Sequence, residues 1–279
     1  MPQRKVLVIA HRGARAEAPE NTLAAFDRAI RIGADWIELD VRLTADGRLA
    51  VIHDESVKRT TGARGKVARM TMRELKRLDA GARFGGAFAG ERIPELAEVV
   101  EACDGRAGLV VEVKDPAGRE AIISARVRKA LAGFRGEAVV ESFDKSFLRL
   151  YKKTVPGARA ALLTESARGL SEARKASADA VSASLRSPAT RLLLPRVKRA
   201  GLGLFVWTVK SFRALARALA FDVDGVITDY PREVRAVLEE LDRAAAYGFS
   251  RPGPGTEGYL RWRRMALKEM KRWPLRPLK

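Results

Sequence analysis

Apolar runs rich in β-branched residues alternate with segments whose apolar residues recur at helical spacing, along almost the whole chain. The apolar runs predict nine strands, at Lys5–His11, Trp36–Leu43, Leu49–His53, Gly108–Lys114, Ala138–Phe143, Arg159–Thr164, Ala180–Ser184, Gly203–Val209 and Gly225–Asp229. The helical spacing is found at Thr22–Ile32, Pro94–Cys103, Ala121–Leu131, Thr190–Ala200 and Ser211–Ala220. Because this alternation is typical of parallel sheets covered by helices, we expect an α/β fold.

The connection between the second and third predicted strands departs from this pattern. It consists of five residues, Thr44–Arg48, and contains Asp46-Gly47. Five residues cannot hold the crossover helix that parallel strands need, and Asp-Gly favours a hairpin turn. We therefore expect Leu49–His53 to return antiparallel to its predecessor. The eight other strands match the number in a (β/α)₈ (TIM) barrel, and a doubly wound open sheet is the alternative.

Two segments lie outside the strand–helix repeat. Residues 54–93 contain six glycines and a short helical pattern at Thr71–Leu78, and they are too long for an ordinary βα loop, so we expect an insertion over one face of the barrel. The Pro- and Gly-rich stretch Arg251–Gly255 predicts a barrel domain at 1–250 and a basic tail at 251–279. The tail has apolar residues near one helical face at Tyr259, Trp262, Ala266, Met270 and Trp273.

Composition and the lengths of the apolar runs indicate in which cellular compartment the protein is expected. The chain has 279 residues, of which 47% are hydrophobic, which is enough for a large core. A single cysteine, Cys103, excludes an internal disulfide framework and is typical of a reducing compartment. The apolar run Val6–Ala10 is too short for a secretory signal, and no run approaches the roughly 20 residues of a membrane span. We expect a cytoplasmic protein.

The net charge of +19 would attract nucleic acid, anionic lipid or small phosphate compounds, or it would simply form a solvated basic surface. The tail carries nine Lys and Arg against two Glu, which leaves +12 on residues 1–250. The charge is therefore dispersed rather than gathered in one stripe. Because the chain also has no nucleic-acid-binding motif, a nucleic-acid-binding module is disfavoured.

The chain contains only two histidines, His11 and His53. Each lies at the carboxyl end of a predicted strand, which is the catalytic face of a barrel. A single histidine at a strand end is more often structural. Two of them provide groups with an ordinary pKa near 6.5, which suits a general base and a general acid.

Acidic residues sit at alternating positions of two predicted strands. Glu38 and Asp40 share one face of their strand, and Glu112 shares a face with Lys114. Their neighbours are apolar, so these carboxylates are expected to be buried and to need a partner. A hard divalent cation, Mg²⁺ or Ca²⁺, would serve, because no Cys/His cluster with zinc spacing exists. The alternative is an Arg–carboxylate network that lines the barrel.

Arg12 and Lys114 place cations beside these acids, which favours an anionic substrate. Arg12 can hold a phosphate group through two hydrogen bonds, whereas Lys114 acts as a point charge. Either cation could instead pair with Glu38 or Glu112.

A series of short motifs extends over about residues 5–240: His11-Arg12-Gly13, Pro19-Glu20-Asn21-Thr22, Glu38-Leu39-Asp40-Val41, Thr44-Ala45-Asp46-Gly47, Val51-Ile52-His53-Asp54, Arg59-Thr60-Thr61-Gly62, Leu78-Asp79-Ala80-Gly81, Ile93-Pro94, Glu112-Val113-Lys114, Ser142-Phe143-Asp144, Val206-Trp207-Thr208-Val209 and Ile227-Thr228-Asp229-Tyr230-Pro231. In this order, the motifs resemble those of the glycerophosphodiester phosphodiesterases, which belong to the barrel-shaped phospholipase-C-like phosphodiesterases. Each motif alone is weak evidence for the family, whereas the combination of all of them in this order is specific to it.

The resemblance implies a metal-dependent hydrolase that converts a small glycerophosphodiester to glycerol 3-phosphate and an alcohol. It implies three groups of site residues. The metal ligands would be Glu38, Asp40 and Glu112; the acid/base pair would be His11 and His53, with His11 favoured as base; and the substrate-binding residues would be Arg12, Lys114, Phe143 and Trp207. For the two aromatic residues, ordinary packing in the barrel is an equal alternative.

The chain departs from the family pattern at Lys145, Lys210 and Glu141, and we expect these residues to affect the alcohol side of the site. We expect Asn21 to cap the helix that starts at Thr22. A lysophospholipase D-type enzyme is the alternative function, with the basic tail in contact with an anionic membrane. The oligomeric state is not readable from the sequence.

Overall fold

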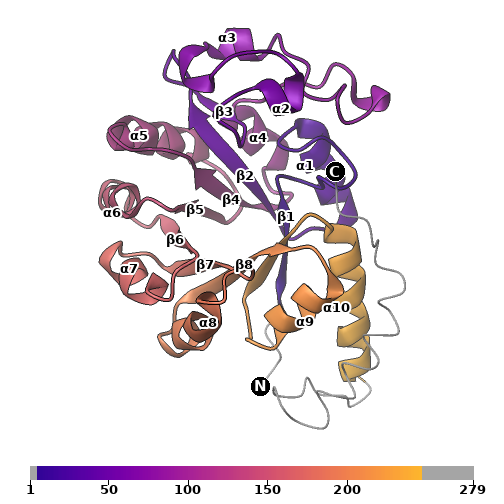
Figure 1. The fold of residues 1–279 in the computed structure, drawn as a ribbon, viewed down its shortest axis with the longest axis vertical. Coiled ribbons are helices and arrows are strands. Elements are labelled where there is room, and N and C mark those ends of the chain that lie inside the picture. The colour runs from indigo at the N-terminus through magenta and orange to yellow at the C-terminus, as the bar shows by residue number, and fades with distance from the viewer. Residues whose placement is uncertain (1–4, 247–279) are drawn as a thin grey trace.

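The computed structural model describes residues 5–246 and shows a closed barrel of eight parallel strands (Figure 1). In chain order the parallel strands are β1 (Leu7–His11), β2 (Trp36–Leu43), β4 (Gly108–Val113), β5 (Ala138–Ser142), β6 (Arg159–Thr164), β7 (Ala180–Ser184), β8 (Gly203–Val209) and β9 (Gly225–Thr228). The pairing of β1 with both β2 and β9 closes the sheet. The predicted barrel is confirmed, and an open sheet is excluded.

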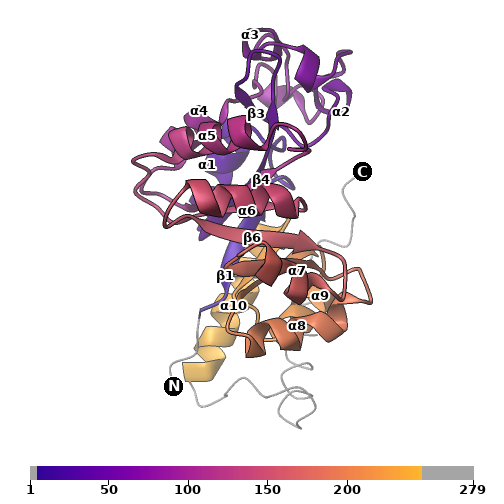
Figure 2. The same cartoon turned by 90° about the vertical axis from the view of Figure 1, so that its left-hand side faces the viewer.

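Helices surround the barrel, and Figures 1 and 2 show them outside the strands. They are α1 (Leu23–Ile32), α4 (Leu96–Cys103), α5 (Glu120–Leu131), α6 (Lys145–Thr154), α7 (Gly169–Lys175), α8 (Thr190–Arg199), α9 (Phe212–Leu219) and α10 (Pro231–Ala246). Each helix buries an apolar stripe against the outer faces of the strands. The outward residues Ile37, Leu39 and Val41 of β2 lie in this main core.

The predicted hairpin is confirmed. Strand β3 (Leu49–Val51) pairs antiparallel with β2, with Val51 opposite Val41. The strand ends before His53, earlier than expected. However, the Ile52 N–H still donates to the Asp40 carbonyl at 2.9 Å, so the chain that leads to His53 remains attached to β2.

The inner face of the barrel changes from apolar to acidic along its axis. Near the amino ends of the strands, inward side chains form an apolar cluster of Ile9, Trp36, Val110, Val139, Ala161, Ala180, Phe205 and Ile227. Nearer the carboxyl ends, the next inward positions include Glu38, Glu112 and Glu141. Side chains on a strand alternate with period two. The same strands therefore supply an apolar layer inside the barrel and, one inward position further on, an acidic layer at its mouth.

The insertion has its own small core. It contains α2 (Lys58–Thr61), α3 (Met72–Leu75) and 3₁₀ turns at Val67–Arg69 and Gly86–Phe88. Helix α3 is shorter than the expected Thr71–Leu78, and a capping box of Thr71 and Glu74 starts it. Its apolar cluster consists of Ala50, Ile52, Val57, Val67, Met72, Leu75, Ala80 and Ile93. The insertion therefore packs on the hairpin, at the top of Figure 1.

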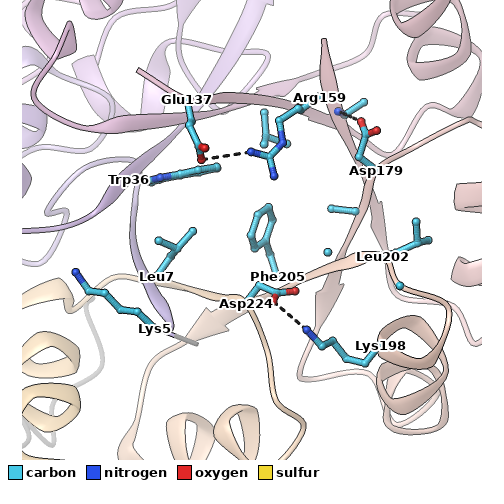
Figure 3. Close-up of a pocket in the computed structure, with 15 residues that line it drawn as sticks. Lys5, Leu7, Trp36, Glu137, Arg159, Asp179, Lys198, Leu202, Phe205 and Asp224 are labelled. Carbon is cyan, nitrogen blue, oxygen red and sulfur yellow. Dashed lines mark hydrogen bonds and ion pairs between the residues drawn. The ribbon is translucent and has the colours of Figure 1, made fainter. Parts of the chain in front are cut away.

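A cavity of about 510 Å³ opens at the amino-terminal end of the barrel, opposite the acidic mouth. Trp36 and Phe205 line it, together with charged residues drawn in Figure 3. These charges form ion pairs: Arg159 contacts Glu137 at 3.3 Å, and Lys198 contacts Asp224 at 2.9 Å.

None of the helices within residues 5–246 is long and apolar enough to cross a membrane. The basic tail at 251–279 lies outside the described residues. The division into a domain at 1–250 and a tail, the role of the tail and the cytoplasmic location stay predictions.

Candidate active site

The strand register brings the candidate residues together at the carboxyl ends of the barrel strands. His11 on β1 is aligned with Glu38 on β2, and Asp40 on β2 is aligned with Glu112 on β4. Glu112 in turn is aligned with Glu141 on β5. A cavity of about 340 Å³ opens here, and both histidines and these three glutamates line it.

A tight turn after β1 fixes the position of Arg12. Its backbone has a φ of 56°, and its N–H donates to Glu38 Oε2 at 2.9 Å. The next residue, Gly13, has a φ of 80°, and a Cβ there would lie 2.7 Å from backbone and side-chain atoms of Ala25 in α1. Only glycine fits this close approach without strain. The His-Arg-Gly motif therefore has a geometric cause.

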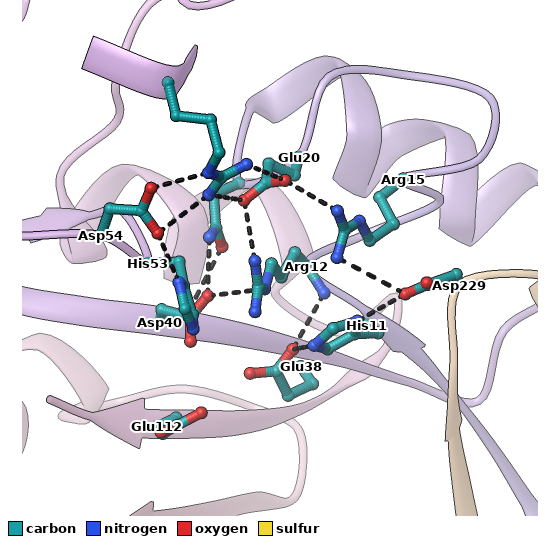
Figure 4. A network of polar contacts seen from close by, with 12 residues as sticks. His11, Arg12, Arg15, Glu20, Glu38, Asp40, His53, Asp54, Glu112 and Asp229 are labelled. Carbon is teal, nitrogen blue, oxygen red and sulfur yellow. Dashed lines mark hydrogen bonds and ion pairs between the residues drawn. The ribbon is translucent and has the colours of Figure 1, made fainter. Parts of the chain in front are cut away.

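Two carboxylates orient the ring of His11. Its Nδ1 lies 2.5 Å from Asp229 Oδ1, and its Nε2 lies 3.9 Å from Glu38 Oε2 (Figure 4). With Nδ1–H donating to Asp229, Nε2 keeps its lone pair and faces the cavity. Burial lowers the pKa of His11 to about 4, although the hydrogen bond that His11 donates to Asp229 opposes this shift. The ring is therefore neutral at pH 7.

His53 is held by the insertion. Its Nδ1 lies 2.7 Å from Asp54 Oδ1, and Arg59 of α2 in turn binds Asp54 with an Nε–Oδ2 distance of 2.6 Å. Arg42 of β2 donates to the His53 carbonyl at 2.7 Å. Partial burial, assisted by the charge of Arg12, lowers the pKa of His53. Its side chain is 33% exposed, against 13% for His11, so it can exchange protons with solvent more readily.

Three buried glutamates form an acidic cluster: Glu38, Glu112 and Glu141 each place a carboxylate oxygen within 4.8 Å of the others. Burial and the nearby carboxylates raise the pKa of all three side chains, to about 7 for Glu112 and about 8 for Glu141. Such shifts mean that the ionised cluster needs more positive charge than the described residues supply.

Asp40 is paired with more Lys and Arg side chains than any of the three glutamates. It forms ion pairs with Arg12 at 3.1 Å and Lys114 at 3.0 Å, and it accepts a hydrogen bond from Asn21 Nδ2 at 2.8 Å. Burial alone would raise the pKa of Asp40, but the two cations outweigh it and hold the pKa below its usual range.

The prediction that Asn21 caps the first helix was wrong, because Thr22 caps α1 by accepting a hydrogen bond from the Ala25 N–H.

The acidic cluster fits a divalent cation. Glu38 Oε1 and Glu141 Oε2 are buried and have no hydrogen-bond partner in the described structure. An unpaired buried carboxylate oxygen costs free energy that a hard cation would offset, since such ions prefer oxygen ligands. The Arg–carboxylate network that the sequence left open as an alternative is thus present at Asp40, while the unpaired oxygens at Glu38 and Glu141 could serve as ligands for a cation.

Both predicted phosphate contacts line the cavity but already have acidic partners. Lys114 Nζ lies 2.5 Å from Glu112 and 3.0 Å from Asp40. Arg12 contacts Glu20 at 2.9 Å, and Arg15 and Arg59 also bind Glu20 (Figure 4). Glu20 therefore binds three guanidinium groups and positions them at the rim of the site.

The two predicted aromatic residues lie together on the cavity wall. Phe143 and Trp207 pack edge to face with ring centroids 6.0 Å apart. Phe143 is 51% exposed, so burial in the core does not explain its position. Lys210 also lines the cavity and binds Asp229 at 2.9 Å, whereas Lys145 pairs with Glu172 of α7 and is not a lining residue.

Two site residues were missed by sequence reasoning. Asp229 carries the hydrogen bond to His11, and its place directly after the last barrel strand was the available signal. Glu141 was expected to affect only the alcohol side, yet it joins the acidic cluster. Its inward position next to Glu112 depends on the register between β4 and β5, which the sequence does not display.

Comparisons with known proteins identify the family. Residues 11–233 match the profile of the Glycerophosphoryl diester phosphodiesterase family. The chain belongs to this family. The resemblance predicted from the motifs is confirmed, and so is the enzyme class, a phosphoric diester hydrolase.

Relatives match over most of their length. The chain is 43% identical over 234 residues to the glycerophosphodiester phosphodiesterase of Caldanaerobacter subterraneus subsp. tengcongensis, covering 81% of this chain and 95% of the relative. It is 34% identical to the enzyme of Bacillus altitudinis, covering 84% and 98%. An Oleispira antarctica phosphodiesterase, solved with its product sn-glycerol-3-phosphate, is similar in structure with a TM-score of 0.78 and 27% identity, covering 84% and 96%.

The turn after β1 leads to a first prediction. We expect Gly13→Ala to lower the unfolding temperature more than Gly33→Ala. Both glycines have positive φ, at 80° and 84°, and an alanine costs about 1–2 kcal/mol in this region. Only Gly13 would also press a Cβ against α1, since nothing lies within 4 Å of the Gly33 position. Thermal unfolding of both variants measures the difference, and equal losses would contradict the close-packing argument.

The two histidines allow a direct test of their electrostatics by NMR. In metal-free protein, we expect the His11 ring signal to stay at its neutral position from pH 8 down to pH 5.5, because burial disfavours the charged ring. A free histidine titrates near pH 6.5. The His11→Ala variant assigns the signal. A midpoint at or above pH 6.5 for His11 would contradict the described environment.

Proposed function

We propose that the protein hydrolyses small glycerophosphodiesters to glycerol 3-phosphate and an alcohol, with a divalent cation and a histidine pair. The observation that carries this proposal is the meeting of His11, His53 and the acidic cluster in one cavity. The carboxylates Asp229 and Asp54 each take Nδ1 of one ring, which leaves both Nε2 atoms available for proton transfer.

We propose that the cation, Mg²⁺ or Ca²⁺, is held by Glu38, Asp40 and Glu112. Oxygens of Asp40 and Glu112 already converge on one positive charge, the ammonium group of Lys114, and Glu38 has an unpaired oxygen on the same side. When bound, the cation would offset negative charge on the phosphoryl oxygens of the substrate. Displacing Lys114 from these two acids would free its ammonium group for the phosphate.

The surrounding residues have distinct proposed roles. Arg12, fixed by its ion pairs with Glu20 and Asp40, presents the planar guanidinium that can bind two phosphate oxygens. Phe143 and Trp207 form the wall against which the substrate lies. The substrate class is supported by the structural relative from Oleispira antarctica, which binds sn-glycerol-3-phosphate.

For the proton transfers, we propose that His11 is the base and His53 the acid. His11 is buried and neutral, so its Nε2 can accept a proton from the nucleophile. His53 reaches solvent, from which it can be reprotonated, and an anionic substrate would raise its pKa. It can then protonate the leaving alkoxide. This division assigns the two proton transfers to separate segments of the barrel mouth, β1 and the chain that follows β3.

Replacing either histidine tests the acid/base pair. We expect His11→Ala and His53→Ala each to lower turnover by about 10²–10⁴-fold, because each removes one proton-transfer group. Release of glycerol 3-phosphate from a panel of glycerophospho-alcohols measures turnover, and thermal unfolding checks the fold. Lys145→Ala, whose ion pair lies outside the cavity, is the matched control. Near-wild-type turnover in both histidine variants would defeat the assignment.

Metal removal tests the cation. We expect exhaustive treatment with EDTA to abolish hydrolysis, because the site then lacks the positive charge that the substrate phosphate requires. Added Mg²⁺ or Ca²⁺ should restore it. Circular dichroism of the chelated protein controls for unfolding. Full activity of folded, metal-free protein would contradict the metal requirement and leave the histidines as the only catalysts.

A further inference from the structure

The acidic cluster contains one carboxylate for which the proposed site has no role. Glu141 is the penultimate residue of β5 and is 1% exposed. The parallel pairing of β4 and β5 aligns it with Glu112. Its carboxylate lies within 4.8 Å of those of both Glu112 and Glu38. Three adjacent strands, β2, β4 and β5, therefore each direct one glutamate into the same space.

The contacts of Glu141 differ from those of an ordinary structural carboxylate. Its Oε2 atom is buried and accepts no hydrogen bond of ordinary geometry within the described part of the chain, although the Ser182 hydroxyl on β7 lies close enough to oppose the rise in the Glu141 pKa. Lys114, which lines the same cavity, forms its ion pairs with Asp40 and Glu112 instead. Glu38 Oε1 is buried and unpartnered in the same way. Two unsatisfied carboxylate oxygens thus belong to one cluster, which is the arrangement expected at a cation site.

The local charges support the same conclusion. Four buried carboxylates meet here, those of Glu38, Asp40, Glu112 and Glu141, and Lys114 and Arg12 are the cations in ion-pair contact with them. Both cations are in contact with Asp40. Their positive charge therefore neutralises Asp40 more than it neutralises Glu38 and Glu141. A divalent cation beside the three glutamates would supply positive charge where it is missing.

We propose that Glu141 is a further direct ligand of the divalent cation, in addition to Glu38, Asp40 and Glu112. The proposal rests on the proposed function for the presence of the cation and extends it with a ligand outside the expected set. It also favours Ca²⁺ over Mg²⁺, because Ca²⁺ accepts many protein oxygens in flexible geometry, whereas Mg²⁺ retains several waters and uses one or two carboxylates.

Calorimetric titration of the metal-free full-length protein with CaCl₂ and with MgCl₂ tests this ligand. We expect Glu141→Gln, which keeps the size but removes the charge, to raise the Kd for Ca²⁺ at least about tenfold. Glu137→Gln is the matched control. Glu137 directly precedes β5 at the opposite end of the barrel and pairs with Arg159, so its replacement should leave the Kd unchanged.

Thermal unfolding supplies a second measurement. Because a ligand that binds only the folded state stabilises it, Ca²⁺ should raise the unfolding temperature of Glu141→Gln less than that of the wild type. A merely structural role of Glu141 would lower the stability of the metal-free variant but leave this gain unchanged. Should Glu141→Gln fail to fold, Glu141→Asp keeps the charge with a shorter reach, and its Kd should lie above that of the wild type.

The outcomes separate this proposal from the proposed function. A Ca²⁺ affinity equal to the wild type in the folded Glu141 variant overturns the ligand assignment, even if hydrolysis depends on metal. A wild type that binds neither ion overturns it as well. A wild type whose Ca²⁺ binding depends on Glu141, but which cleaves no glycerophosphodiester, supports the ligand and defeats only the proposed function.

Discussion

Four carboxylates from three neighbouring strands share a buried space at the mouth of this barrel, and the surrounding structure is arranged around that concentration of negative charge. Burial of ionised carboxylates is unfavourable unless cations or hydrogen bonds compensate them. Arg12 and Lys114 compensate Asp40, whereas Glu38 and Glu141 keep unpaired oxygens. The unequal distribution leaves a defined place for additional positive charge.

Closure of the barrel brings the proposed catalytic groups of distant segments to this place. His11 is on the first strand and its partner Asp229 follows the last, yet β1 and β9 are adjacent. His53 directly precedes the insertion, and the contacts of Arg59 with Asp54 and Glu20 tie that insertion to the loop after β1. Each imidazole is thus oriented by an element that depends on the completed fold. The orientation of the two imidazoles and the packing of the barrel mouth therefore have a common origin.

Much of this arrangement follows from local sequence patterns. The strand–helix alternation and the short Asp-Gly connection were enough to predict eight parallel strands and one hairpin, since both depend on residues close in the chain. The period of two along a strand also placed Glu38 and Asp40 on one inner face. Those inferences need no knowledge of which strands become neighbours.

The residues whose roles were not predicted correctly from the sequence are those whose roles depend on contacts between distant segments. Asn21 has the residue type of a helix cap, but Thr22 takes that position and the Asn21 amide bonds to Asp40 on β2. Glu141 has an inward position only because β5 pairs with β4 in a particular register. The carboxylate at Asp229 is likewise invisible as a partner until the barrel closes. Spacing along one strand predicts a shared face, but it cannot predict which side chain across the sheet completes a site.

The two cavities of the barrel show why unpaired charge, rather than volume, marks the site. The cavity at the amino-terminal end is larger, at about 510 Å³ against about 340 Å³, and it also has charged residues at its rim. There, Arg159 and Lys198 each have an acidic partner, over an aromatic floor. The smaller cavity joins neutral imidazole nitrogens to carboxylate oxygens that lack partners. Under the proposed function, a phosphodiester and a divalent cation would satisfy groups in the second cavity that the protein itself leaves unsatisfied, whereas the described residues around the first cavity present no comparable need.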